Sequence, residues 1–303
     1  MKIDHRAAAP IVSRFRELGG EGLEIRQLNH RTFFVRYGGS LMHIVKTGRD
    51  INQSHHQDFV VLAPRVGVNL LRSVNWVEWE DQRYGVIDVL FESRFATADE
   101  VFRTAKIMFA DMSLGIRFFH PPKVKFALDL IRSAYACHES NQFPNKDLKR
   151  YQQRLWNLVA SLRVVEDKDA AQGFFHGDMR YGNVIVNTDR RDKNFYVTDF
   201  DGCGLSYRAM DLVSAFCQGY MEEGLSDSKK LKAAKLCYKQ MYDLVEGECG
   251  ALDAKNLKYL IVTFLYWKHV IVEPLRSPIS DAMNRIVRIS KLVESAVKVV
   301  KGL

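Results

Sequence analysis

The stretch FFHGDMRYGNVIVN, residues 174–187, places a polar segment between two apolar runs. Within this segment Asp178 and Asn183 are five residues apart, and a second apolar run that follows a polar turn ends at Asp199. Apolar runs separated by turn-forming residues predict two strands joined by a hairpin over 184–198. Two strands that return on each other bring Asp178, Asn183 and Asp199 together at one end.

Such a polar cluster requires a binding partner, because ionised carboxylates beside apolar strands are costly unless they are paired, hydrogen-bonded or bound to a metal. One Asp oxygen and one Asn oxygen are ligands that a hard cation such as Mg²⁺ takes, with water and phosphate oxygens in the remaining positions. A second Asp, not needed for the metal, can accept a proton from a hydroxyl. The pattern therefore indicates phosphoryl transfer.

The segment HGDMRYGN resembles the HGDxxxxN catalytic loop of the aminoglycoside phosphotransferase and choline kinase-like family. The later segments DFDGCG and RAMDL resemble the metal-binding segment of that family and the helix after it. The spacing of Asp178 and Asn183 is also that of the protein kinase catalytic loop. The resemblance implies a two-lobed α+β protein kinase-like fold, with a small sheet-rich N-lobe at 1–91 and a larger, mainly helical C-lobe at 92–303.

The resemblance also implies roles for the loop residues. Asp178 becomes the catalytic base that receives the acceptor hydroxyl, and Asn183 and Asp199 become the magnesium ligands. His176 becomes a scaffold for the loop. Arg180 stands where protein kinases of the Ser/Thr type carry a lysine that contacts the transferred phosphate, so its guanidinium can stabilise charge in the transition state.

The N-terminal half supplies the nucleotide-binding residues that the resemblance implies. Lys46, at the end of SLMHIVK, matches the lysine or arginine that holds the α- and β-phosphates, and the backbone around Asp88 and Leu90 matches the hinge that meets the purine. The implied cofactors are ATP or GTP, together with Mg²⁺. Asp211 is expected to tie the following helix to the loop. One departure is that the helix after Lys46 offers only glutamines and Asp58 as partners for that lysine.

Hydrophobic periodicity agrees with two regions of different structure. From Leu23 to Phe91, short runs rich in β-branched and aromatic residues alternate with turn-like segments, which predicts a sheet. From Thr97 onward the apolar residues recur at helical spacing. The expected helices span roughly 97–119, 125–163, 208–221, 226–246, 253–273 and 278–300.

Charge and composition limit the classes of partner. The chain has 303 residues, 47% of them hydrophobic, and can bury a sizeable core. Its formal charge of +8 is compatible with acidic ligands such as nucleotides. The lysines between 229 and 239 share their segment with apolar residues at helical spacing, which predicts a solvated helix face. No basic patch interleaved with aromatics is visible, so nucleic acid is not expected as a partner.

Cysteine usage and hydropathy bear on the cellular compartment. The five cysteines are odd in number, far apart and never in a CxxC arrangement, so neither a disulfide framework nor a structural zinc site is supported. The N-terminal segment MKIDHRAAAP lacks the apolar region of a secretory signal, and Lys268 interrupts the apolar stretch YLIVTFLYW. We therefore expect a cytoplasmic protein that makes no use of a membrane.

The resemblance implies a magnesium-dependent phosphotransferase that moves the γ-phosphate of ATP or GTP to a hydroxyl of a small molecule. Two alternatives on the same fold stay open: a protein Ser/Thr kinase of stress-response type, with a protein acceptor, and a catalytically inactive kinase-like binding module. The acceptor is not specified by the motif. Aminoglycosides and choline are cationic and would favour an acidic pocket, whereas this chain is basic overall. The net charge therefore argues against these two acceptors.

Overall fold

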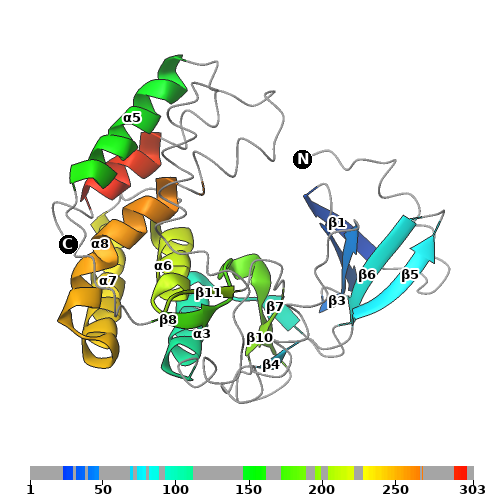
Figure 1. Ribbon diagram of the computed structural model, residues 1–303. Coiled ribbons are helices and arrows are strands. Elements are labelled where there is room, and N and C mark those ends of the chain that lie inside the picture. The colour runs from blue at the N-terminus through cyan, green and yellow to red at the C-terminus, as the bar shows by residue number, and fades with distance from the viewer. Residues whose placement is uncertain are drawn as a thin grey trace. The chain divides into compact units, whose positions relative to one another are not determined.

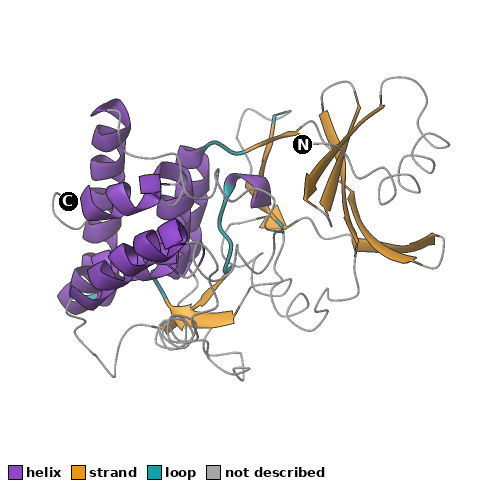
Figure 2. Cartoon of the chain, turned by 90° about the horizontal axis from the view of Figure 1, so that it is seen from above, coloured by secondary structure: helices purple, strands orange, loops and turns teal. Residues whose placement is uncertain are grey.

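The computed structural model describes residues 23–29, 32–37, 40–47, 69–70, 74–79, 82–88, 93–111, 146–161, 172–188, 195–198, 204–221, 228–266, 268 and 290–298. The chain divides into two compact units. The first comprises residues 1–96 and 182–201, and the second comprises residues 97–181 and 202–303. Strands dominate the first unit and helices dominate the second (Figure 2). The lobe boundary that the sequence suggests after residue 91 stays a prediction.

The first unit contains a five-stranded antiparallel sheet in the order β1-β2-β3-β6-β5 (Figure 1). Its strands are β1 (Leu23–Asn29), β2 (Thr32–Tyr37), β3 (Ser40–Thr47), β5 (Val74–Trp79) and β6 (Gln82–Asp88). Three consecutive residues of β2, namely Phe33, Phe34 and Val35, are buried, so both faces of this strand are covered. The ring of Phe34 lies 4.7 Å from that of Phe95, which belongs to a second sheet in the same unit.

The second sheet of this unit has the order β4-β10-β9-β7. Its strands are β4 (Asn69–Leu70), β7 (Ser93–Phe95), β9 (Val184–Asn187) and β10 (Phe195–Val197). The hairpin predicted from the sequence is confirmed, because β9 and β10 are antiparallel with Val184 opposite Val197. Every residue of β9 is buried, which explains why its sequence VIVN is apolar without alternation. The short strands β4 and β7 were not predicted.

The second unit is mainly helical. Its elements are α3 (Ala98–Asp111), α5 (Lys146–Ser161), α6 (Met210–Phe216), the π-helical turn η5 (Cys217–Met221), α7 (Ser228–Cys249), α8 (Ala251–Tyr266) and a helical segment at 290–298. Helical structure is observed within each of the six segments predicted to be helical, and the parts of those segments at 112–119, 125–145, 162–163, 226–227, 267, 269–273, 278–289 and 299–300 lie outside the described residues. A two-stranded antiparallel sheet of β8 (Gln172–Phe175) and β11 (Gly204–Tyr207) accompanies them.

Both ends of α3 are fixed by side chains. At the start, the Thr97 N–H donates to Glu100 Oε2 at 3.0 Å and the Glu100 N–H donates to Thr97 Oγ1 at 3.4 Å, which is a capping box. In the last turn, the buried Arg208 donates from Nε and Nη2 to the Phe109 carbonyl at 3.0 and 2.9 Å. Its guanidinium also lies 4.5 Å from the Phe109 ring centroid. Arg208 thereby attaches α3 to the turn from which α6 begins.

A glycine reverses the chain between α7 and α8. Gly250 has φ of +101°, a left-handed conformation that glycine adopts without steric cost, and its N–H donates to the Glu246 carbonyl at 3.0 Å. The apolar helix α8 that follows belongs to the core, where the ring of Tyr266 lies 5.6 Å from that of Trp156 on α5. Among the helices that the structure describes, none is both long enough and apolar enough to span a membrane.

Candidate active site

The loop that follows β8 is anchored by a carboxylate from α6. Asp211, in the first turn of α6, accepts the His176 N–H at Oδ2 over 2.7 Å and the Gly177 N–H at Oδ1 over 3.1 Å. Gly177 has φ of 90°, so the bend that presents both N–H groups to one carboxylate requires glycine. The prediction that Asp211 ties the helix to the loop is confirmed.

The anchoring carboxylate is held away from water. Asp211 is 4% exposed, and burial raises the pKa of Asp211 above the ordinary value of an aspartate. Attraction to His176 and the hydrogen bonds from the His176 and Gly177 backbones lower the same pKa and offset part of this effect. Attraction to His176 and the two N–H groups together make a carboxylate tolerable at this buried position.

The loop residues alternate between the interior and the surface. His176 and Met179 are fully buried, whereas the side chains of Asp178 and Arg180 are 34% and 32% exposed. The Asp178 N–H donates to Nδ1 of His176 at 3.2 Å, so the imidazole holds the backbone of the residue beside it. This alternation explains why Met179, an apolar residue, stands between two charged ones in HGDMR, and it directs both charged side chains outward.

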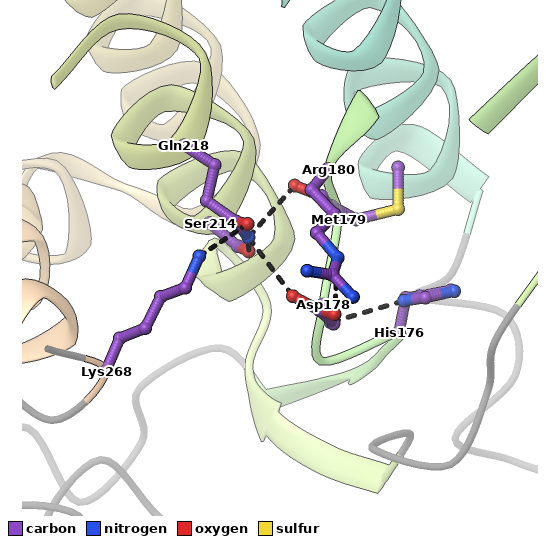
Figure 3. Close-up of polar contacts among 7 residues, drawn as sticks. All are labelled: His176, Asp178, Met179, Arg180, Ser214, Gln218 and Lys268. Atoms are coloured by element: carbon purple, nitrogen blue, oxygen red, sulfur yellow. Dashed lines mark hydrogen bonds and ion pairs between the residues drawn. The ribbon is translucent and has the colours of Figure 1, made fainter. Parts of the chain in front are cut away.

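The carboxylate of Asp178 is contacted through both of its oxygens (Figure 3). Oδ2 lies 2.9 Å from Nε of Arg180, a distance typical of an ion pair, although the angle does not satisfy a hydrogen bond. Oδ1 accepts a hydrogen bond from Nε2 of Gln218 at 3.3 Å. The carboxylate of Asp178 is therefore held from two sides, by one hydrogen bond and one ion pair.

Asn183 lies at the other end of the loop, where the 3₁₀ turn η3 (Tyr181–Asn183) leads into β9. It is 3% exposed, and its carbonyl accepts the N–H of Thr198 at 3.0 Å. Thr198, which follows β10 and directly precedes Asp199, therefore lies beside the start of β9, as the hairpin predicts. Asp199 itself lies outside the described residues.

The residues predicted to bind the nucleotide are placed only through their strands. Lys46 is opposite Thr32 of β2 and Gly85 of β6, and Asp88 ends β6 opposite His43 of β3. The side chains of Lys46 and Asp88, and the whole of Leu90, lie outside the described residues. Within the described part of the chain, no three His, Cys, Asp or Glu side chains gather in a way that would hold a metal ion.

Sequence reasoning missed three residues that extend the site beyond the loop, namely Ser214, Gln218 and Lys268. Two of them carried a signal in the sequence. Gln218 is a polar residue in the otherwise apolar run AFCQGYM, and Lys268 lies two residues after the end of the apolar helix α8. A polar side chain within a buried run requires a hydrogen-bonding partner, so each of these two residues indicates a polar network.

One family model matches the part of the chain that contains this loop. Residues 108–244 match the model of the phosphotransferase enzyme family, and this segment contains His176, Asp178, Asn183 and Asp211. A search of curated proteins finds no match.

Solved structures share the fold at low identity. The microcompartment-associated aminopropanol kinase has a TM-score of 0.62 at 15% identity, covering 96% of this chain and 97% of that one. Amicoumacin kinase in complex with AMP-PNP, Ca²⁺ and Ami has a TM-score of 0.59 at 14% identity, covering 96% of each chain. The GDP complex of wild-type aminoglycoside 2′-phosphotransferase-IIIa has a TM-score of 0.61 at 13% identity, covering 97% of this chain and 98% of that one. A phosphotransferase family model matches the segment that contains HGDMRYGN, and the solved structures share a two-lobed protein kinase-like fold, so the resemblance predicted from this segment is confirmed.

Proposed function

We propose that the protein is a magnesium-dependent phosphotransferase that moves the γ-phosphate of ATP or GTP to a hydroxyl group of a small molecule. The observation that carries this proposal is the carboxylate of Asp178, which is fixed through the loop anchor at Asp211 and has Arg180 2.9 Å from Oδ2. The structures of relatives in complex with AMP-PNP and GDP support the use of a nucleotide.

In this proposal Asp178 accepts the proton of the acceptor hydroxyl while the hydroxyl oxygen attacks the γ-phosphorus. Arg180 moves from Asp178 to the transferred phosphoryl group, where a guanidinium stabilises the charge of the transition state. Asn183 and Asp199 would hold Mg²⁺, and the ion would supply positive charge that offsets the charge on the phosphate oxygens. Lys46 holds the α- and β-phosphates.

A small molecule is preferred over a protein as the acceptor because the relatives with the same fold are named for small-molecule reactions, on aminopropanol, amicoumacin and aminoglycosides. The purine contacts the backbone between Asp88 and Leu90 in this proposal.

The test is to incubate the pure protein with γ-labelled ATP and Mg²⁺, alone and with pooled metabolites. Label in a small molecule supports the proposal. Label in protein supports a protein kinase instead, and label in neither supports an inactive binding module.

ATP and Mg²⁺ together are expected to raise the thermal midpoint of unfolding, since a ligand at about 100 times its Kd adds roughly 2.7 kcal/mol to the native state. Asn183→Ala is expected to reduce that increase, measured against the variant's own midpoint by scanning fluorimetry, because one metal ligand is lost. Asn157→Ala, at an exposed position on α5, is the matched control and should keep the full increase. An equal increase with ATP in the presence of a chelator would contradict the metal assignment.

Arg180→Ala is expected to lower turnover by about a hundredfold, the low end of the usual effect of a missing charge-stabilising donor. The loss is limited because the same change removes the group that competes with the hydroxyl for Asp178 Oδ2. Arg180→Lys should recover part of the turnover, since the charge returns without the planar fork. Single-turnover kinetics at saturating ATP measure both, with Arg154→Ala on the surface of α5 as control. Full turnover in Arg180→Ala would make this residue a surface arginine with no part in the reaction.

A further inference from the structure

The side-chain amide of Gln218 is engaged at both ends (Figure 3). Its Nε2 donates to Ser214 Oγ at 2.8 Å, to Asp178 Oδ1 at 3.3 Å and to the Met179 carbonyl at 3.3 Å. Its Oε1 accepts from Nζ of Lys268 at 2.6 Å. A lysine ammonium can only donate, so Lys268 fixes which end of the amide is the oxygen and thereby directs Nε2 toward the catalytic loop.

The backbone that carries Gln218 is a π-helical turn locked against α3. The Cβ of any larger residue at Gly219 would lie 3.1 Å from Cβ of Ala98, so glycine permits the close approach of the turn to the start of α3. The Tyr220 hydroxyl donates to the Asp99 carboxylate. Burial, together with this hydrogen bond, raises the pKa of Tyr220, which keeps the hydroxyl a donor. Wide π turns are frequent at functional sites, and this one aims Gln218 at the loop.

The two oxygens of the Asp178 carboxylate therefore have different partners. Oδ1 faces an amide whose nitrogen and oxygen are both hydrogen-bonded within the second unit, so the donor to Oδ1 is itself held in place by Ser214 and Lys268. Oδ2 faces Arg180, which is 32% exposed and imperfectly aligned. Oδ1 is the fixed oxygen and Oδ2 is the exchangeable one.

We propose that Gln218 is a positioning residue that holds Oδ1 of Asp178 so that Oδ2 receives the acceptor proton, and that Lys268 orients the Gln218 amide for this role. The inference rests on the proposed function. In the step concerned, the acceptor oxygen forms a bond to the γ-phosphorus, the bond from that phosphorus to the β–γ bridging oxygen breaks, and the nucleoside diphosphate leaves. The hydroxyl proton goes to Oδ2 and is later released to water.

Gln218→Leu keeps the size of the side chain and removes the amide. Turnover should fall by about 10- to 100-fold, the usual effect of losing a hydrogen bond to a charged group, while the Kd of the nucleotide stays unchanged. Gln218→Glu should fall to the same extent, because a carboxylate still accepts from Lys268 but cannot donate to Oδ1. The probe is phosphate release from ATP and Mg²⁺ with water as the acceptor. Lys268→Met should lower turnover by a smaller factor, since the Gln218 amide is retained but can rotate by 180° and exchange the places of its oxygen and nitrogen.

A matched control exists in the same unit. Lys106 Nζ donates to Gln240 Oε1 at 3.5 Å in a solvent-exposed contact that repeats the lysine-to-glutamine pairing without a catalytic partner. Gln240→Leu should leave turnover and nucleotide Kd unchanged. A fall equal to that of Gln218→Leu would show that loss of any such pair lowers activity, and would overturn the proposal.

A merely structural role for Gln218 is excluded by combining variants. In an Asp178→Asn background, Gln218→Leu should cause no further fall in turnover, because the group that Gln218 positions is then an amide and its second atom can no longer act as a base. A structural residue would lower turnover by the same factor in both backgrounds, and that result would overturn the proposal. So would full turnover in Gln218→Glu, a variant that can be judged even if Gln218→Leu fails to fold.

Failure of this inference can be distinguished from failure of the proposed function. If Asp178→Asn lowers phosphate release but the Gln218 variants do not, only the positioning role is wrong. If the wild-type protein releases no phosphate from ATP or GTP, or if Asp178→Asn releases it at the wild-type rate, the proposed function is wrong and the role of Gln218 falls with it.

Discussion

Replacement of Asp178 by asparagine is expected to lower turnover by about two to four orders of magnitude, the usual contribution of a positioned general base. The amide oxygen that Asp178→Asn introduces could still accept from Gln218, as Asp178 Oδ1 does at 3.3 Å, so the loop should keep its conformation. What is lost is the ability to take a proton from the acceptor hydroxyl. Binding of the nucleotide, which does not need that proton transfer, should be retained.

Single-turnover kinetics at saturating ATP measure the loss of turnover in Asp178→Asn. The increase in thermal midpoint with ATP and Mg²⁺ measures whether nucleotide binding is retained. Asp243→Asn is the control, since Asp243 is exposed on α7. The mechanism would be contradicted by wild-type turnover in Asp178→Asn. A parallel loss of nucleotide binding would instead place Asp178 among the groups that hold the phosphates.

Removal of the loop anchor by Asp211→Ala is expected to lower the free energy of unfolding by about 2 to 5 kcal/mol, because two backbone N–H groups lose their acceptor and each buried unsatisfied donor costs roughly 1 to 3 kcal/mol. The loss stays below the full sum because the cost of burying the carboxylate, which raises the pKa of Asp211, disappears with it. Turnover should fall as well, since the backbone before Asp178 is no longer fixed at His176 and Gly177.

Urea denaturation gives the stability of Asp211→Ala, with Asp243→Ala as the exposed counterpart. Asp211→Asn should lie between the wild type and Asp211→Ala, because its single amide oxygen can still accept one of the two N–H groups. A variant Asp211→Ala with wild-type stability and turnover would show that water replaces the carboxylate, and that the loop needs no protein anchor.

The parts of the fold that sequence predicted are those specified locally. The hairpin of β9 and β10 follows from two apolar runs around a polar turn, and the helices follow from apolar spacing and from capping groups such as Thr97 and Glu100. The strands β4, β7 and β11 have two to four residues, too few to display an alternating pattern. Their existence depends on partners distant in the chain, such as β9 for β7.

In the candidate site, too, the residues that could be predicted lie close together in the sequence, and those that were missed lie far from the loop. The contact of Arg180 with Asp178 and the support from His176 lie within one loop, and the motif indicated these residues. Gln218 and Lys268 are separated from Asp178 by 40 and 90 residues, and tertiary packing of the π turn brings the first of them to the loop. In the sequence Lys268 served only as evidence against a membrane span, although a buried apolar run with one lysine also indicates a polar network.

The anchor at Asp211 has a consequence for how this loop can be re-engineered. Within the described part of the chain, the hydrogen bonds of Asp211 come from main-chain N–H groups, so this anchor places no demand on the side chains at positions 179–181. Met179 must stay apolar because it is fully buried, but Tyr181 is 58% exposed and free of that constraint. A library randomised at Tyr181 should therefore yield mostly folded variants without a compensating mutation elsewhere.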